Sequence, residues 1–312
     1  MNAAPLPNLQ PCRLLTLDGG GAKGFYTLGV LREVEALIDC PLSERFDLIY
    51  GTSTGAVIAA LLALGRRVND IHALYKEYVP AVMRPWSRAA KSRALEELAS
   101  KVFASSRFED VQTDLGIVSA RWDFGTPMIF KSNRAGAHGR NASFVPGFGC
   151  SIAQAVQASC SAYPFFNRKI VITQDGDRIE LIDGGYCANN PTLYAIADAL
   201  IALRKDPANV RVVSLGVGVY PEPRTFSWSR LLRRWWPVQL LQKTLSINTL
   251  SMDQLRGILF AAVPTVRISD TFAEPEMATD LLEHDLVKLN MLNQRGRQSF
   301  ARHEAELTQF LL

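Results

Sequence analysis

The sequence predicts an α/β protein in which a β-sheet is layered between helices. Apolar runs of strand length alternate with segments of helical periodicity, and two of these runs end in glycine-rich turns. No internal repeat or low-complexity block interrupts the alternation. The 312 residues are 48% hydrophobic and 21% charged, which excludes the collagen-like, disordered and coiled-coil classes.

A single domain is expected, because no linker composition separates the predicted strands and helices. We expect residues 1–11 to be a disordered tail, residues 12–200 to form a core that carries the motifs, and residues 201–312 to complete the same domain. The start of the chain has no basic segment followed by an apolar one, so no signal peptide is expected.

Charge and cysteine content narrow the classes of partner. The 34 basic and 30 acidic residues leave a net charge of +4, which is too mild to indicate a polymeric nucleic acid as partner. The five cysteines form no CxxC pair, so neither a disulfide framework nor a structural zinc site is expected, and a reducing cytosol fits. We predict no metal and no cofactor.

The first elements have the clearest pattern. Arg13–Leu17 is an apolar run that ends in glycines, which predicts a strand, and helical spacing follows over Tyr26–Ile38. Leu48–Gly65 is uncharged and close to the transmembrane length of about 18 residues. Its three glycines and its hydroxyl-bearing residues fit a buried strand, a sharp turn and a buried helix better, over Phe46–Tyr50 and Ala56–Leu64.

The later elements are predicted from shorter patterns. Residues 66–110 are charged and mainly helical in pattern, and Asp280–Leu312 has the same character. The remaining expected elements are three strands, a helix and a last strand, at Pro127–Phe130, Lys169–Ile172, Arg178–Ile182, Ile196–Leu203 and Val210–Val219.

The first motif is a glycine loop, Asp-Gly-Gly-Gly-Ala-Lys-Gly at residues 18–24, between a predicted strand and a predicted helix. Such a loop exposes backbone N–H groups at a helix N-terminus, which favours an anion. Gly19, Gly21 and Gly24 also spell GxGxxG, so a nucleotide-binding protein is an alternative, as is a plain tight turn. Against a dinucleotide fold, Asp47 lies near the start of the second strand and not at its end.

The second motif is Gly51-Thr52-Ser53-Thr54-Gly55, a GxSxG sequence between a strand and a helix. A nucleophile elbow requires this context, because a sharp turn presents the serine hydroxyl and small flanking residues avoid a clash. The context therefore favours Ser53 as a nucleophile over a plain glycine turn.

The third motif is Asp183-Gly184-Gly185, which follows a strand-like run and alone indicates only a turn. Together the three motifs supply amide donors for an oxyanion, a nucleophile and a carboxylate. Each lies at a strand end, where sheet enzymes place their sites.

In this order the three motifs resemble those of the patatin-like phospholipase family. Ala158–Phe166 and Ala188–Pro191 also look like the family's segments before and after the aspartate, so that the resemblance spans residues 12–200. It implies a three-layer α/β/α fold with a mainly parallel central sheet.

The resemblance implies phospholipase A-type hydrolysis of glycerophospholipid esters by a serine–aspartate dyad with no catalytic histidine. Ser53 would attack the ester, and Asp183 would take the hydroxyl proton. Because an ordinary aspartate has a pKa of about 3.9, this dyad needs a short, partly desolvated contact. The amides of Gly20 and Gly21 would be the main donors of an oxyanion hole formed by Gly19, Gly20, Gly21, Lys23 and Gly24.

A Ser-Asp-His triad of a housekeeping esterase or lipase is the alternative within the hydrolases. In α/β-hydrolases the histidine follows the acid, and only His284 and His303 follow Asp183. Both lie in the predicted helical C-terminal segment, without the loop signals of a catalytic histidine. We therefore interpret them as surface residues.

An amphipathic segment at residues 226–237 predicts a membrane contact. Helical spacing places three arginines opposite its tryptophans and leucines, a composition typical of an interfacial helix. A core-facing helix and a contact between copies in a homo-oligomer are the alternatives. The residues of the predicted contact are Trp228, Leu231, Trp235 and Trp236 on one face and Arg230, Arg233 and Arg234 on the other.

Short bacterial patatin-like proteins include antiphage effectors that degrade membrane phospholipid when a cyclic oligonucleotide binds. The resemblance therefore extends to a cyclic oligonucleotide as activator and to a phospholipid bilayer as substrate. It also implies a cytoplasmic protein that is peripherally associated with the inner membrane.

Overall fold

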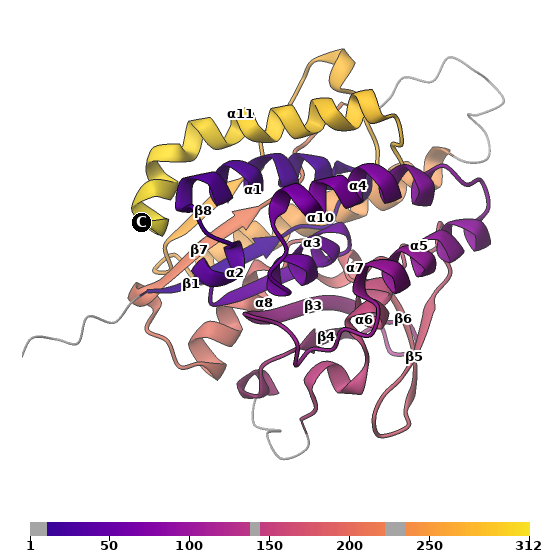
Figure 1. Ribbon diagram of the computed structural model, residues 1–312, viewed down its shortest axis with the longest axis horizontal. Coiled ribbons are helices and arrows are strands. Elements are labelled where there is room, and N and C mark those ends of the chain that lie inside the picture. The colour runs from indigo at the N-terminus through magenta and orange to yellow at the C-terminus, as the bar shows by residue number, and fades with distance from the viewer. Residues whose placement is uncertain (1–10, 138–143, 222–234) are drawn as a thin grey trace, which may run out of the picture.

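The fold is built on one mixed β-sheet (Figure 1). The computed structural model describes residues 11–137, 144–221 and 235–312. Within these ranges the strand order is β5-β6-β3-β2-β1-β7-β8, with β4 paired to β3. The strands are β1 (Cys12–Leu17), β2 (Leu48–Thr52), β3 (Asp114–Arg121), β4 (Pro127–Lys131), β5 (Lys169–Ile172), β6 (Arg178–Asp183), β7 (Val210–Leu215) and β8 (Thr265–Ile268).

The centre of the sheet is parallel and one side is antiparallel. β1 pairs in parallel with β2 and β7, and the β2–β3 and β7–β8 pairs are parallel too. β6 and β4 run antiparallel to β3, and β5 runs antiparallel to β6. The mainly parallel central sheet implied by the family resemblance is therefore confirmed.

Helices cover both faces of the sheet, as Figure 1 shows. Alternate residues of β1 pack on opposite faces of the sheet. Leu15 and Leu17 belong to the core with α1 and α3, while Leu14 packs in the cluster with α8. The helices are α1 (Gly24–Ile38), α2 (Leu42–Arg45), α3 (Thr54–Ala63), α4 (Val68–Met83), α5 (Arg88–Phe103), α6 (Ile152–Ser159), α7 (Gly185–Ala188), α8 (Thr192–Ala197), α10 (Trp235–Leu259) and α11 (Leu286–Leu311).

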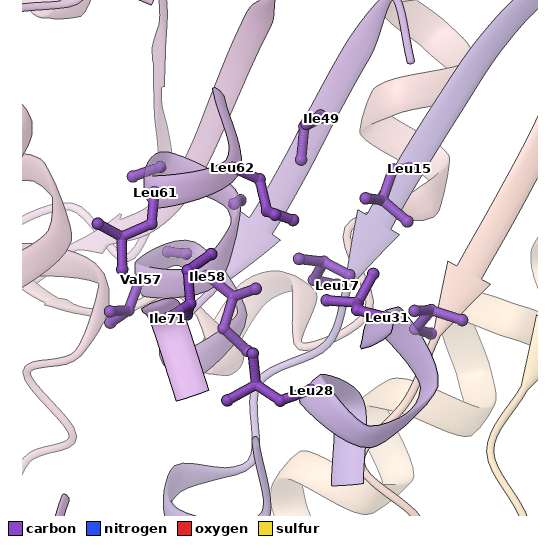
Figure 2. Close-up of a cluster of buried hydrophobic side chains, with 14 of the residues drawn as sticks. Leu15, Leu17, Leu28, Leu31, Ile49, Val57, Ile58, Leu61, Leu62 and Ile71 are labelled. Carbon is purple, nitrogen blue, oxygen red and sulfur yellow. The ribbon is translucent and has the colours of Figure 1, made fainter. Parts of the chain in front are cut away.

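Figure 2 shows the core between the sheet and α1 and α3, where Leu15 and Ile49 lie among leucines and isoleucines of the helices. Every residue of α3 is buried, because the sheet, α4 and α6 surround it. This burial explains why Leu48–Gly65 carries no charge. In the described ranges, no helix combines the length and apolar character needed to cross a membrane.

The C-terminal helix α11 packs along α1, and two glycines allow the close approach (Figure 1). A Cβ atom on Gly29 would lie 2.1 Å from the carbonyl oxygen of Asn293. A Cβ atom on Gly296 would lie 2.1 Å from the carbonyl oxygen of Tyr26. The Asn293 side chain also donates a hydrogen bond of 3.1 Å to the carbonyl of Phe25.

The predicted elements are present, with several ends shifted. The helix predicted over Ile196–Leu203 begins earlier, as α8, and continues as a π-helix at Asp198–Ala202. The strand predicted over Val210–Val219 ends at Leu215, and the C-terminal helix begins at Leu286, so that residues 280–285 form a loop. β3, β8, α6 and most of α10 were not predicted. Residues 1–10 of the predicted tail lie outside the described residues.

Candidate active site

The register of the sheet brings the sequence motifs together at the end of the sheet where β1 and β2 have their carboxyl ends. β2 and β6 flank β3, where Val118 pairs with Thr52 and the next residue, Ser119, pairs with Asp183. Ser53, which follows Thr52, therefore lies beside Asp183. β1 lies on the other side of β2 and stops at the same end of the sheet, so the glycine loop leaves the sheet there as well.

Ser53 occupies a strained turn between β2 and α3. Its φ is 52° and its ψ is −122°, a conformation that costs a non-glycine residue about 1–3 kcal/mol. A Cβ atom on Gly51 would lie 2.3 Å from the carbonyl oxygen of Gly55. The turn therefore needs glycine at this flank, and Ser53 stands where the predicted nucleophile elbow places its serine.

The Ser53 hydroxyl donates a hydrogen bond of 2.7 Å to Oδ2 of Asp183. Asp183 is 3% exposed, and its Oδ1 accepts a hydrogen bond of 2.7 Å from the Gly185 amide. Burial raises the pKa of Asp183 from 3.8 to about 6, although both hydrogen bonds favour the charged form. The structure thus contains the short, desolvated contact that a serine–aspartate dyad needs.

The end of α6 and the residues just after it hold both Ser53 and Asp183 in place. Oγ of Ser159, which is fully buried, accepts a hydrogen bond of 2.8 Å from the Ser53 amide and donates one to a carbonyl of β3. The carbonyl of Ser159 accepts from the Gly184 amide, and that of Ser161 accepts from the Asp183 amide. Ser159 lies in the segment that carries the family resemblance, but no sequence pattern indicates its role.

Two residues of the glycine loop line the site with backbone amides that have no partner among the described residues. Gly20 and Gly21 line the pocket together with Ser53, and neither N–H group makes a hydrogen bond within those residues. They are therefore available to a negatively charged oxygen that forms next to Ser53.

The backbone amides of the other three predicted oxyanion donors make hydrogen bonds within the protein. The amide of Gly19 donates to the carbonyl of Asn189 at 3.0 Å, and that of Lys23 donates to the carbonyl of Gly20 at 3.2 Å. The Gly24 amide caps the turn that precedes α1. The Lys23 ammonium group is buried 6.0 Å from the ring of Tyr220, and this burial lowers its pKa to about 8.

A buried ion pair anchors the start of the glycine loop. Arg267 on β8 donates to both carboxylate oxygens of Asp18, at 2.9 and 2.5 Å, and to the Ser214 hydroxyl at 2.9 Å. Asp18 is 2% exposed. Bidentate pairing of this kind fixes orientation as well as position. Arg267 was not predicted as a site residue, because no sequence pattern indicated the strand β8 that carries it.

An apolar pocket extends from Ser53 between the helices. Besides Gly20, Gly21, Ser53 and Asp183, its lining is almost entirely aliphatic and aromatic, which suits an acyl chain. The lining comes from α3, α4, α5, α10 and two loops, and it includes Val57, Leu61, Tyr75, Val79, Leu95, Leu98, Leu241 and Leu245 from the helices and Phe165 and Leu281 from the loops.

Neither histidine that follows Asp183 lies between Ser53 and Asp183, as the alternative triad would require. A triad requires an imidazole between hydroxyl and carboxylate, whereas Ser53 binds Asp183 directly. His303 faces Glu306 on α11. His284 lies in the loop before α11 and not in the predicted helix, and its Nδ1 is 3.2 Å from the carbonyl of Leu282.

Most of the predicted membrane segment lies outside the described residues. This applies to residues 226–234, which include Trp228, Arg230, Leu231, Arg233 and Arg234. Trp235 and Trp236 belong to the first turn of α10, which continues to Leu259.

A strained serine elbow, a buried carboxylate bonded to the serine and an apolar pocket at the end of an α/β sheet define a serine hydrolase for apolar acyl esters. A family model described as Patatin-like phospholipase matches residues 15–196, which is more than half of the chain. The chain belongs to the patatin-like phospholipase family. This membership confirms the resemblance drawn from the motifs and the expectation of a lipid-hydrolysing enzyme.

Individual relatives support the same assignment. A protein of Escherichia coli named cUMP-AMP-activated phospholipase is 64% identical over 301 residues, covering 96% of this chain and 94% of that protein. A cGAMP-activated phospholipase of E. coli strain TW11681 is 25% identical over 245 residues, covering 72% and 66%. The solved structure of VipD from Legionella pneumophila matches with a TM-score of 0.50 and 12% identity, covering 97% and 67%, which supports the fold alone.

Proposed function

We propose that this chain is a phospholipase that hydrolyses acyl esters of glycerophospholipids through Ser53 and Asp183. The proposal depends on one observation above all, the 2.7 Å hydrogen bond between the Ser53 hydroxyl and a buried carboxylate at the head of an apolar pocket. Membership of the family and the names of the relatives support the substrate class.

In the proposed first step, Ser53 Oγ attacks the ester carbonyl carbon, and its proton passes to Oδ2 of Asp183. The N–H groups of Gly20 and Gly21 stabilise the oxyanion of the tetrahedral intermediate. When this intermediate collapses, Asp183 returns the proton to the departing lysophospholipid oxygen and an acyl group stays on Ser53. A water molecule deprotonated by Asp183 then releases the fatty acid, and the proton returns to Ser53.

The proposal includes activation by a cyclic dinucleotide. The relative that is 64% identical over 96% of the chain is named for activation by cUMP-AMP, so this nucleotide is the first candidate. The more distant relative is named for cGAMP. A role in antiphage defence, by degradation of the bacterium's own phospholipid, follows from the resemblance to such effectors.

Hydrolysis of liposomal lipid tests the proposal directly. Liposomes of phosphatidylethanolamine and phosphatidylglycerol are incubated with the protein and cUMP-AMP, cGAMP or no nucleotide, and released fatty acid is measured. We expect release with cUMP-AMP, and none from Ser53→Ala or Asp183→Ala. The double variant should lose no more than either single one, because the two residues act as a unit.

An exposed serine on α5, Ser100, provides the matched control, since Ser100→Ala should keep full activity. Substantial turnover by Ser53→Ala or Asp183→Ala would contradict the dyad. Equal hydrolysis with and without nucleotide would contradict only the proposed activation.

Contact with the bilayer is proposed for the outer side of α10. Its inner side contributes Leu241 and Leu245 to the pocket. An exposed aliphatic surface beside a pocket that suits an acyl chain favours contact with a bilayer. The outer side carries aliphatic residues that are 57–68% exposed, namely Leu240, Ile247, Leu250 and Ile258.

Replacement of Ile247 and Ile258 by glutamine tests this contact. We expect the double variant to bind liposomes less and to hydrolyse bilayer lipid more slowly, while a short water-soluble ester is hydrolysed normally. Gel filtration accompanies the assay. Unchanged bilayer activity, or conversion of an oligomer to a monomer, would contradict the membrane contact.

A further inference from the structure

Asn189 lies between the glycine loop and α10 and bonds to both. Its side-chain amide donates hydrogen bonds of 3.1 Å to the carbonyl of Gly19 and of 2.7 Å to the hydroxyl of Thr249. Its own carbonyl accepts from the Gly19 amide at 3.0 Å. Gly19 is therefore held on both sides of its α-carbon by one residue that is 5% exposed.

The hydrogen bond to the Gly19 carbonyl sets the direction of the next N–H group. The peptide bond between Gly19 and Gly20 is trans, so its carbonyl and its N–H point in opposite directions. With the carbonyl turned toward Asn189, the Gly20 N–H points away from Asn189. Gly20 lines the pocket beside Ser53, and its amide has no partner among the described residues.

We propose that Asn189 is a positioning residue of the oxyanion hole: it orients the peptide that presents the Gly20 N–H to the reacting ester. The inference rests on the proposed hydrolytic function. The acceptor oxygen of Asn189, Oδ1, is buried without a hydrogen-bond partner among the described residues, so this position uses the two donors of the amide.

α10 in turn holds Asn189 in place. The side chain of Asn248 accepts a hydrogen bond of 2.7 Å from the backbone N–H of Asn189 and donates one of 3.1 Å to the carbonyl of Cys187. Thr249 accepts from the Asn189 side chain and donates to the carbonyl of Leu245, within its own helix. The helix that forms one wall of the pocket is therefore tied to the oxyanion peptide through a single side chain.

Asn189→Leu tests the assignment, because leucine has nearly the same shape and no donor. With a water-soluble ester, we expect kcat to fall by up to about 10²–10³, the usual cost of one oxyanion donor, with KM nearly unchanged. Inactivation by a fluorophosphonate should slow in parallel, because the oxygen of its adduct takes the oxyanion position. The pH midpoint of activity should stay the same, since Asn189 does not bond to Asp183.

Two further variants keep the test decisive. The neighbour Asn190 is 1% exposed and its Oδ1 caps Thr192, so Asn190→Ala removes a buried amide without touching Gly19 and should keep kcat. Thr249→Val leaves Asn189 in place but removes one of its partners, and should lower kcat by about fivefold, in line with the loss of one hydrogen bond.

The outcomes are distinguishable. If Ser53→Ala is inactive while Asn189→Leu keeps its kcat, or raises KM alone, the positioning role is wrong and the hydrolytic function stands. Equal loss of kcat in Asn189→Leu and Asn190→Ala would show a general effect of burial and would also overturn the role. If Ser53→Ala is as active as the unaltered protein, the hydrolytic function itself fails.

Discussion

The carboxylate of Asp183 is almost fully buried, yet it keeps two hydrogen-bond donors, Ser53 and Gly185. Burial raises its pKa to about 6, which makes it a better base near neutral pH than an exposed aspartate. The same burial destabilises the folded protein when Asp183 is charged, because the unfolded chain hydrates this charge fully. Burial of Asp183 therefore favours catalysis but lowers the free energy of unfolding at neutral pH.

The first prediction concerns the pH dependence of activity. Asp183 accepts a proton only when it is ionised, so kcat/KM for a neutral, water-soluble ester should rise through pH 6 and level off above it. The profile is measured between pH 4 and 9 in the unaltered protein and in His284→Asn. Full activity at pH 4, or a midpoint that disappears in His284→Asn, would contradict the role of Asp183 as the base.

The second prediction concerns stability. The folded-state pKa of Asp183 lies above its unfolded value, so ionisation costs stability above pH 6, and this cost disappears below pH 3.8. Asp183→Asn removes the charge but keeps the shape. It should raise the free energy of unfolding at pH 7 by up to about 3 kcal/mol, as urea unfolding measures. The gain should shrink from pH 6 to pH 4, and a variant less stable than the unaltered protein at pH 7 would contradict the argument.

Among the elements, the glycine loop has a backbone with little freedom to change. Gly21 has a φ of +58°, and a Cβ atom there would lie 2.4 Å from the carbonyl oxygen of Leu281. Gly176 also has a positive φ, +87°, but an added Cβ would meet nothing within 4 Å. The two positions thus share a positive φ, which would strain an alanine, and differ in their surroundings.

Gly21→Ala should therefore lower kcat by about 10²–10³ with little change in KM, because it displaces an oxyanion donor. Gly176→Ala should cost about 1–2 kcal/mol of stability through strain and leave kcat unchanged. Steady-state kinetics on a soluble ester and thermal unfolding of both variants separate the effects. An increase in KM alone for Gly21→Ala would show that this amide does not hold the oxyanion.

How far the elements could be predicted from the sequence depends on where their signals lie. The glycine loop, Ser53 and Asp183 each lie at the end of a strand and carry a local turn pattern, so the sequence was sufficient to find them. β3 was missed because Gly116 and Ser119 interrupt its apolar run. Gly116 is required there, since a Cβ atom would lie 2.3 Å from the ring of Tyr50, and no local pattern shows this.

The supporting residues of the site could not be predicted for a related reason. Ser159, Asn189 and Arg267 contact partners that are 106, 170 and 249 positions away in the sequence. Which polar side chains meet is decided by the register of strands that are distant in the chain. α10 was missed because aliphatic residues occupy both its inner and its outer side, which conceals the helical period.

For the molecule as a whole, the packing of α11 on α1 joins the last described helix to the first. Gly296→Ala places a methyl group against the backbone of Tyr26, and we expect a loss of about 1–3 kcal/mol in the free energy of unfolding. Gly257→Ala on α10 is the matched control, because nothing lies within 4 Å of its added Cβ.

Gly257→Ala should stabilise the protein by roughly 0.5–1 kcal/mol, since alanine is the better helix former. Urea unfolding of both variants checks the pair. Equal stability of Gly296→Ala and the unaltered protein would mean that α1 and α11 can separate slightly without loss.

The order in which the chain is synthesised gives the contact between α1 and α11 another consequence. α1 begins at Gly24, directly after the glycine loop, but α11 is translated after every strand of the sheet. Leu281, which lines the pocket and accepts a hydrogen bond from the Ala22 amide, is also translated late. A nascent chain that already exposes Ser53 therefore still lacks one wall of its pocket and the helix that covers α1. The complete pocket can therefore form only after the segment that contains Leu281 has been translated.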